Sequence, residues 1–88
     1  MNDRDQVAQA FKHALASHGT DVQVHVEAGS ADYFHVIVVS RGFEGQSMAD
    51  RNRVSREALR GLGPTLAIRV TVVMLLTPEE YQDIRDVA

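Results

Sequence analysis

The sequence predicts an α+β domain in which helices pack on a mixed three-stranded sheet. Apolar residues recur at helical spacing in two stretches, and other stretches are valine-rich runs that alternate or are continuously apolar. The order is helix, strand, strand, helix, strand, helix, and a right-handed crossover through the second helix makes the second and third strands parallel. At 88 residues the chain can bury one modest core, so we expect a single domain over residues 1–88.

The first half of the chain is expected to form a helix and a β-hairpin. Apolar positions within 7–15 share one helical stripe, which predicts a helix over residues 3–18. Valines alternate with polar residues over 22–27, the pattern of a half-buried strand. A glycine and a serine at 29–30 supply the turn into a second strand over residues 33–40.

A middle helix is expected from Ser47 to about Arg60. Ser47 and Asp50 have the spacing of a capping box, and two glycines and a proline within 61–64 stop the helix. A helical projection gathers the apolar side chains on one arc, which we expect to face the core. These side chains are Met48, Val54, Ala58, Leu59 and Leu62.

The third strand and a last helix complete the predicted fold. The run over residues 66–76 is almost continuously apolar, which is typical of a central strand, and its alternation places Arg69, Val73 and Leu75 on one sheet face. Because three small helices cannot cover both faces, we expect this face to meet a partner protein or a second copy of the chain. Thr77-Pro78-Glu79-Glu80 has the cap, the proline and the acids of a helix start. The buried side of that helix is expected to be Tyr81, Ile84 and Val87 or Ala88.

The composition excludes several kinds of chemistry. The chain has no cysteine, so it has no disulfide, no thiolate metal site and no thiol nucleophile. No combination of nucleophile, base and orienting group is recognisable, and no phosphate loop follows a strand. We therefore expect a binding protein, not an enzyme, with no metal and no other cofactor.

The sequence predicts neither a membrane span nor a secretion signal. The longest apolar run, residues 66–76, has 11 residues and contains Arg69, so it is too short to cross a bilayer. The first five residues are mixed in charge and lead into an amphipathic stretch, unlike a signal peptide. We expect a cytoplasmic protein.

Positive charge is concentrated in the middle of the chain. The net charge is −3, yet residues 41–69 hold six arginines against three acids. Arg53, Arg56 and Arg60 fall on the side of the middle helix opposite its apolar arc, and Arg41 precedes them. A solvated helix face has this pattern, and so has an anion-binding ridge, because guanidinium groups pair bidentately with phosphates. The ridge predicts contacts of these four arginines with DNA or RNA.

Arg51 does not fit the pattern of the middle helix. It projects into the apolar arc, in the first turn, where the helix dipole disfavours a cation. A buried guanidinium needs a carboxylate, a group of carbonyls or a ligand as its partner. We expect a buried Arg51 held by a structural salt bridge.

Four segments resemble the BolA family. They are Phe34-His35-Val36-Ile37-Val38-Val39-Ser40, Phe43-Glu44-Gly45, Arg51-Asn52-Arg53-Val54 and Thr77-Pro78-Glu79-Glu80-Tyr81. The family has Arg-His-Arg in the third segment, so Asn52 replaces a histidine. The resemblance covers about residues 22–83 and implies a class II KH-like fold. It also implies one of two roles: a DNA-binding transcriptional regulator linked to stress and cell shape, or a partner of monothiol glutaredoxins that shares a 2Fe–2S cluster.

The residues argue against the cluster-sharing role. The family uses a histidine early in the third strand and a histidine or cysteine in the hairpin loop. Here the strand position holds Arg69, which cannot ligate iron, and residues 28–33 contain neither residue type. We therefore expect nucleic-acid binding, and the alternative is an adaptor that docks a monothiol glutaredoxin without supplying cluster ligands.

Two further patterns have a structural explanation. His13, His18, His25 and His35 could suggest a metal site, but without cysteines three of them would have to converge, so we expect ordinary surface histidines. Residues 42–45 spell the GxxG of nucleic-acid-binding KH loops. A KH loop joins two helices, whereas this segment follows a strand, so we expect a tight turn with Phe43 tucked beneath it.

Overall fold

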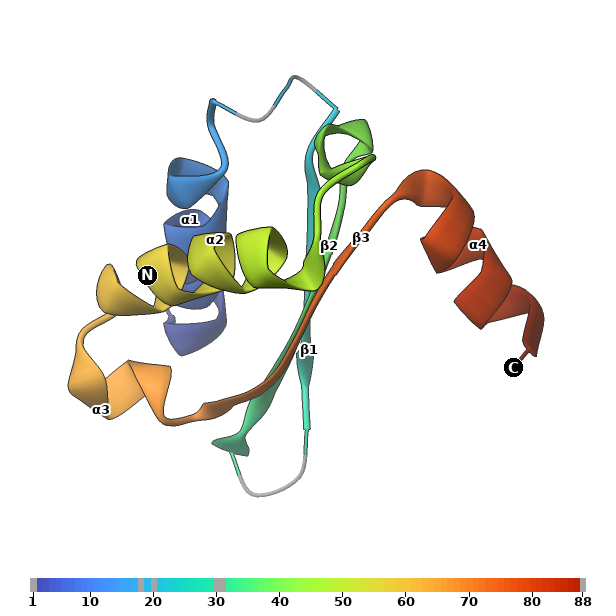
Figure 1. The fold of residues 1–88 in the computed structure, drawn as a ribbon. Coiled ribbons are helices and arrows are strands. Elements are labelled where there is room, and N and C mark those ends of the chain that lie inside the picture. The colour runs from blue at the N-terminus through green and yellow to red at the C-terminus, as the bar shows by residue number, and fades with distance from the viewer. Residues whose placement is uncertain (1, 18, 20, 30–31, 88) are drawn as a thin grey trace.

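The structure is a computed structural model that describes residues 2–17, 19, 21–29 and 32–87 (Figure 1). Its helices are α1 (Asp3–Ala14), α2 (Met48–Arg60), α3 (Pro64–Ala67) and α4 (Pro78–Val87), and a 3-10 turn, η2 (Arg41–Phe43), follows the second strand. Its strands are β1 (Gln23–Ala28), β2 (Phe34–Val39) and β3 (Val70–Leu76). The predicted α+β class and the order α-β-β-α-β-α are confirmed, with η2 and α3 as additions.

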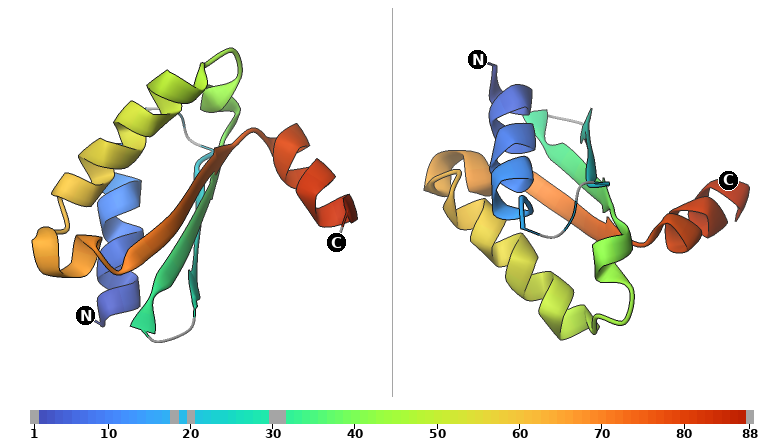
Figure 2. Two further views of the ribbon diagram at one scale, coloured as in Figure 1. Left: turned by 60° about the horizontal axis from the view of Figure 1, so that its bottom comes forward. Right: turned by 90° about the horizontal axis from the view of Figure 1, so that it is seen from above.

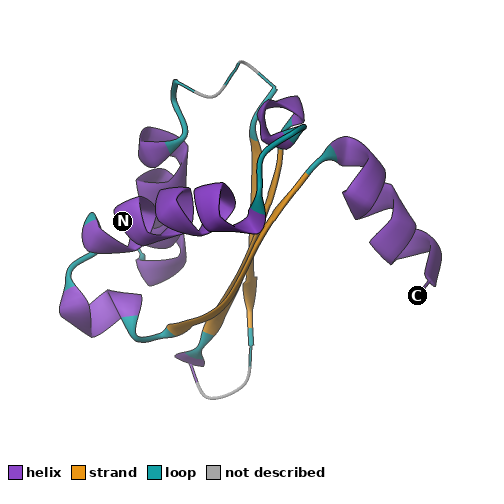
Figure 3. Ribbon diagram, in the orientation of Figure 1, coloured by secondary structure: helices purple, strands orange, loops and turns teal. Residues whose placement is uncertain are grey.

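The sheet is mixed, with β2 at its centre (Figure 3). β1 pairs antiparallel with β2, and β3 pairs parallel with β2, as the crossover through α2 requires. α1, α2 and α3 lie on one side of the sheet, and α4 projects from the other (Figure 2). The core fills the space between the sheet and the first three helices, where Val36 and Val38 of β2 meet Val7 and Phe11 of α1.

The first helix is shorter than predicted. α1 ends at Ala14, not at residue 18. Leu15 is its C-cap, and the backbone of this residue is no longer helical (φ −101°, ψ 7°). The Leu15 side chain is fully buried in the core, so the chain turns at this residue and heads back toward β1. His18 lies outside the described residues.

The third strand is also shorter than predicted, because the apolar run begins with a helical turn. Pro64–Ala67 form α3, and β3 begins only at Val70. Gly63 adopts a positive φ of 79°, which a glycine tolerates. Pro64 then occupies the first helical position, where a backbone N–H would have no partner within the helix, so its absence in proline costs no hydrogen bond. This turn buries Leu66 against the core.

The last helix begins as predicted, but its expected buried side is wrong. α4 turns away from the sheet after Thr77 (Figure 2), so Ile84 is 43% exposed and Tyr81 is half-buried. The side chains of Val87 and Ala88 lie outside what the structure describes.

The expected partner face is wrong as well. Leu75 is a buried core residue and Val73 packs against that core, so both face the helices. Arg69 precedes β3 and bonds to Asp3 of α1, on the same side. The alternation holds from Val72 to Leu75, but it breaks before that: a register shift between Phe34 and His35 leaves Val70 packed on the core, on the same side as Val73. Alternation also cannot tell which face the helices cover. The face turned away from α1, α2 and α3, which we call the open face, instead carries Val72 and half-buried residues such as Met74.

Candidate nucleic-acid interface

Helix α2 begins and is oriented as its sequence predicts. The Ser47 side chain caps it by accepting a hydrogen bond from the Asp50 N–H at 3.1 Å. Val54 and Ala58 are buried against the core, while Leu59 and Leu62 are half-buried beside it. The prediction for Met48 is wrong: as the first residue of the helix it is 69% exposed.

The side of α2 opposite this core stripe carries Arg53, Arg56 and Arg60, which we call the arginine face. All three are exposed, as predicted. Arg53 lies 3.7 Å from Asp50, a long contact between two well-exposed side chains that contributes little to stability. Among the described residues, Arg56 and Arg60 have neither an ion pair nor a side-chain hydrogen bond. Their guanidinium groups are therefore available to an external anion.

Arg56 and Arg60 line a hollow between α2 and α3. The hollow has a volume of about 390 Å³. Its other lining residues are mostly apolar: Leu59, Gly63, Pro64 and Ala67. A mostly apolar hollow that is also lined by two cations suits a ligand that has both an anionic group and an apolar surface.

A glycine-containing turn joins the two helices that form the hollow. It spans Gly61 to Gly63, with Gly61 as the C-cap of α2 and Gly63 as the N-cap of α3. This turn was not predicted, because Leu66 was assigned to a strand; the available signal in the sequence was Pro64 directly after Gly63. The structure thus places a glycine turn between two helices, at a different site from residues 42–45.

Residues 42–45 form the tight turn that was predicted. Phe43 ends η2 and is fully buried, and Gly45 adopts a positive φ of 77°. Arg41 begins η2 and is exposed. It lies beyond the N-terminal end of α2, away from Arg56 and Arg60 near the other end, so the structure does not bring it to the hollow (Figure 1).

Asp21 fixes the start of η2. Its carboxylate accepts hydrogen bonds from the Arg41 N–H at 2.9 Å and from the Ser40 hydroxyl at 3.0 Å. The bond from the Arg41 backbone is the main reason that the pKa of Asp21 lies below its ordinary value, and the Ser40 bond adds to it. This carboxylate holds the backbone at the start of η2 and does not contact the arginine face.

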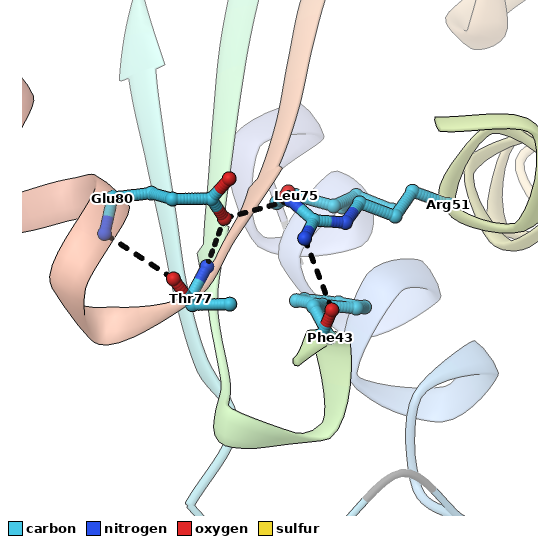
Figure 4. A network of polar contacts seen from close by, with 5 residues as sticks. All are labelled: Phe43, Arg51, Leu75, Thr77 and Glu80. Carbon is cyan, nitrogen blue, oxygen red and sulfur yellow. Dashed lines mark hydrogen bonds and ion pairs between the residues drawn. The ribbon is translucent and has the colours of Figure 1, made fainter. Parts of the chain in front are cut away.

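Arg51 is buried and paired, as predicted, and its network is shown in Figure 4. Its Nη1 donates to Glu80 Oε1 at 2.7 Å and to the Leu75 carbonyl at 3.0 Å, and its Nη2 donates to the Phe43 carbonyl at 3.0 Å. The Thr77 N–H also donates to Glu80 Oε1, at 2.8 Å. This backbone bond, followed by the bond from Arg51, holds the pKa of Glu80 below its ordinary value. Arg51 is thus a structural residue, as we expected, and its neighbour Asn52 is exposed.

Comparison with known proteins gives no match: no family model, no curated protein and no solved structure matches this chain. Within the described part of the chain, no three His, Asp or Glu side chains are grouped so that they could hold a metal ion. The same residues include no helix with the length and apolar character needed to cross a membrane. His25 and His35 lie on the same sheet face, since they pair with Ile37 and Glu27 in one register.

Arg69 joins three segments instead of facing a partner. Its Nη1 lies 2.7 Å from Asp3 Oδ2 of α1, and its Nε donates to the Asp32 carbonyl in the hairpin at 2.8 Å. Its guanidinium also lies 5.0 Å from the centre of the Phe34 ring. All these contacts hold the N-terminal end of α1 and the hairpin against the start of β3.

Proposed function

We propose that this chain is a BolA-like regulatory module of the cytoplasm that binds nucleic acid through the arginine face of α2. The observation that carries the proposal is the pair of free guanidinium groups, Arg56 and Arg60, on the rim of an apolar hollow next to a glycine turn. Arginine pairs bidentately with phosphate oxygens, and KH-type modules grip a nucleic-acid backbone at a glycine loop between helices.

Binding of this kind depends on phosphate neutralisation, not on the reading of bases. Each neutralised phosphate of a single strand releases counterions, so three contacts give a log–log salt slope of about −2. Tyr33 is the one described aromatic residue that is well exposed, at 43%, and it lies in the hairpin, away from the hollow. Sequence preference should therefore be small, because few side chains are available to stack on bases.

The test is fluorescence anisotropy of a labelled single-stranded oligonucleotide, measured at several salt concentrations. Replacing Arg56 and Arg60 together with Gln should weaken binding to every sequence and flatten the slope by about 1.4, two contacts at about 0.7 each. The matched control replaces Lys12 and Arg85, two exposed cations of α1 and α4, with Gln. This control changes the net charge equally but should leave the slope unchanged.

Two results would overturn the proposal. The first is a wild-type protein with no salt-dependent binding at low ionic strength. The second is an equal loss of affinity in the Lys12 and Arg85 control, which would show only a response to net charge.

A second candidate, an adaptor that docks a monothiol glutaredoxin, is favoured by the open face of the sheet. The residues do not fit a shared 2Fe–2S cluster in this role. Arg69 stands where the BolA family has its cluster-ligating histidine, and it is bonded to Asp3 and to the Asp32 carbonyl. Residues 28–33 contain no histidine or cysteine. An adaptor role would therefore operate through protein contacts alone.

A further inference from the structure

The open face, turned away from α1, α2 and α3, carries an apolar strip along β2 and β3, whereas β1 contributes the polar side chains of Gln23, His25 and Glu27 to it. The strand register places Ile37 of β2 beside Met74 of β3, and His35 beside Val72. Ile37 and Met74 are half-buried, and Val72 is 40% exposed. Of the described helices, only α4 lies on this side of the sheet (Figure 2).

Helix α4 is attached to the rest of the chain mainly through its first turn. Glu80 bonds to Arg51 and Thr77, and the Tyr81 ring stacks on His25 with centroids 5.8 Å apart. Beyond Tyr81, every residue over 82–86 is exposed, including Ile84. The ribbon shows the helix projecting away from the sheet (Figure 1). A ten-residue helix is marginal in water without tertiary packing, so α4 needs a surface to pack against.

The total surface of the chain indicates how much area is left to cover. The accessible surface is 5,686 Å². A compact monomer of this mass should expose about 5,100 Å², so the excess is about 600 Å² per chain. If two copies covered this excess against each other, the interface would total about 1,200 Å², just above the size of about 1,000 Å² that a specific interface needs.

The charges around the open face argue against a polyanionic occupant. Arg85 is the one described Lys or Arg of α4, and its guanidinium already lies 5.6 Å from the centre of the Tyr81 ring. The helix carries the acids Glu79, Asp83 and Asp86, which repel phosphates and anionic lipids. The surface is thus suited to a protein and not to a nucleic acid or a membrane.

We propose that two copies of this chain associate about a two-fold axis, with α4 of each copy packed on the open face of the other. A two-fold interface uses the same surface on both copies, and this surface contains both an uncovered apolar sheet and a projecting helix with an exposed isoleucine. Ile84 of one copy covers Val72 and Met74 of the other. The arginine faces lie on the opposite side of the sheet and remain free in the dimer.

The test is sedimentation velocity over a range of protein concentrations. The wild type should shift from monomer to dimer as its concentration rises, because interfaces near the lower size limit are typical of weak, reversible association. Ile84→Asp and Val72→Asp should each weaken dimerisation by about tenfold or more, because each buries an unpaired carboxylate. Ile68→Asp is the matched control, since Ile68 is 75% exposed in the connection between α3 and β3, outside the proposed interface.

Each outcome decides the proposal. All three positions are exposed, so the variants should keep the wild-type midpoint of urea unfolding, because exposed substitutions usually change stability little. A wild type that stays monomeric at protein concentrations up to about 1 mM would overturn the proposal and leave the open face to a different protein. A dimer that Ile84→Asp does not weaken, or that Ile68→Asp weakens equally, would place the interface elsewhere and would also overturn it.

Discussion

Arg51 is the residue that connects the most distant parts of this fold. Its guanidinium joins α2 to the end of β3, to η2 and to the first turn of α4 through Leu75, Phe43 and Glu80. The side chain is 10% exposed and Glu80 is 45% exposed, so a buried cation pairs with a carboxylate that still reaches water. The arginine side therefore carries most of the desolvation cost, which the two carbonyls help to offset.

We predict that Arg51→Ala destabilises the fold by about 2–4 kcal/mol, because it leaves two backbone carbonyls without their donor. The loss should fall below that of a fully buried ion pair, since the freed Glu80 can be solvated. Arg51→Lys should recover little of the lost stability, because one ammonium group cannot make the hydrogen bonds that the planar guanidinium group makes. Urea denaturation measures both, with exposed Arg53→Ala as a control that should change stability by less than about 0.5 kcal/mol. A loss below 1 kcal/mol for Arg51→Ala, the low end of the cost of one unmade buried hydrogen bond, would contradict the network in Figure 4.

The lowered pKa of Glu80 predicts how stability depends on pH. Its pKa is depressed in the folded state by the Thr77 N–H and then by Arg51. Its stabilisation is therefore fully present above the pKa of an unfolded glutamate, about 4.3, and is lost as the pH falls through the lower folded value. The difference in unfolding free energy between wild type and Glu80→Gln should be largest at neutral pH and shrink in acid. Urea titrations across this range measure it, and a pH-independent difference would contradict the assignment. Asp21, whose pKa is also lowered, is common to both proteins and cancels.

At the scale of elements, the edges of the sheet are each capped by an arginine from a helix. The Leu76 carbonyl accepts from the Ser40 N–H, so the neighbouring Leu75 carbonyl points to the outer edge of β3, where Arg51 donates to it. On the other edge, Arg4 of α1 donates to the Val26 carbonyl of β1 at 2.8 Å. Edge strands expose unpaired backbone groups, and each of these two bonds satisfies one such carbonyl.

The elements that sequence reasoning predicted correctly are those whose signals are local. The cap at Ser47 and the apolar arc predicted α2, and the position of Arg51 in that arc predicted a buried, paired cation. What failed depended on tertiary packing. Leu66 is apolar in a strand-like run, but it reaches the core only if Pro64 starts a helical turn. The hollow beside Arg56 could not be predicted either, because α3, which the sequence did not predict, forms one of its walls.

At the scale of the whole molecule, the sheet separates two surfaces of different chemistry. The side covered by α1, α2 and α3 presents the arginine face, and the other side presents the open face with the acidic α4. Sequence alternation alone could not assign these sides, which is why Val73 and Leu75 were expected on the wrong one. The separation means that a ligand on α2 and a second copy on the open face do not compete for space.

Hydrogen exchange of the whole chain should distinguish a free α4 from a packed one. Amides of the central strand β2 should exchange only through global unfolding, whereas α4, held through its first turn, should open locally at a much smaller free energy. If α4 packs on a second copy, its protection should rise with protein concentration while that of β2 changes little. Ile84→Asp should remove this concentration dependence without altering protection in β2. An α4 as strongly protected as β2 in dilute protein would mean that the helix packs on its own chain.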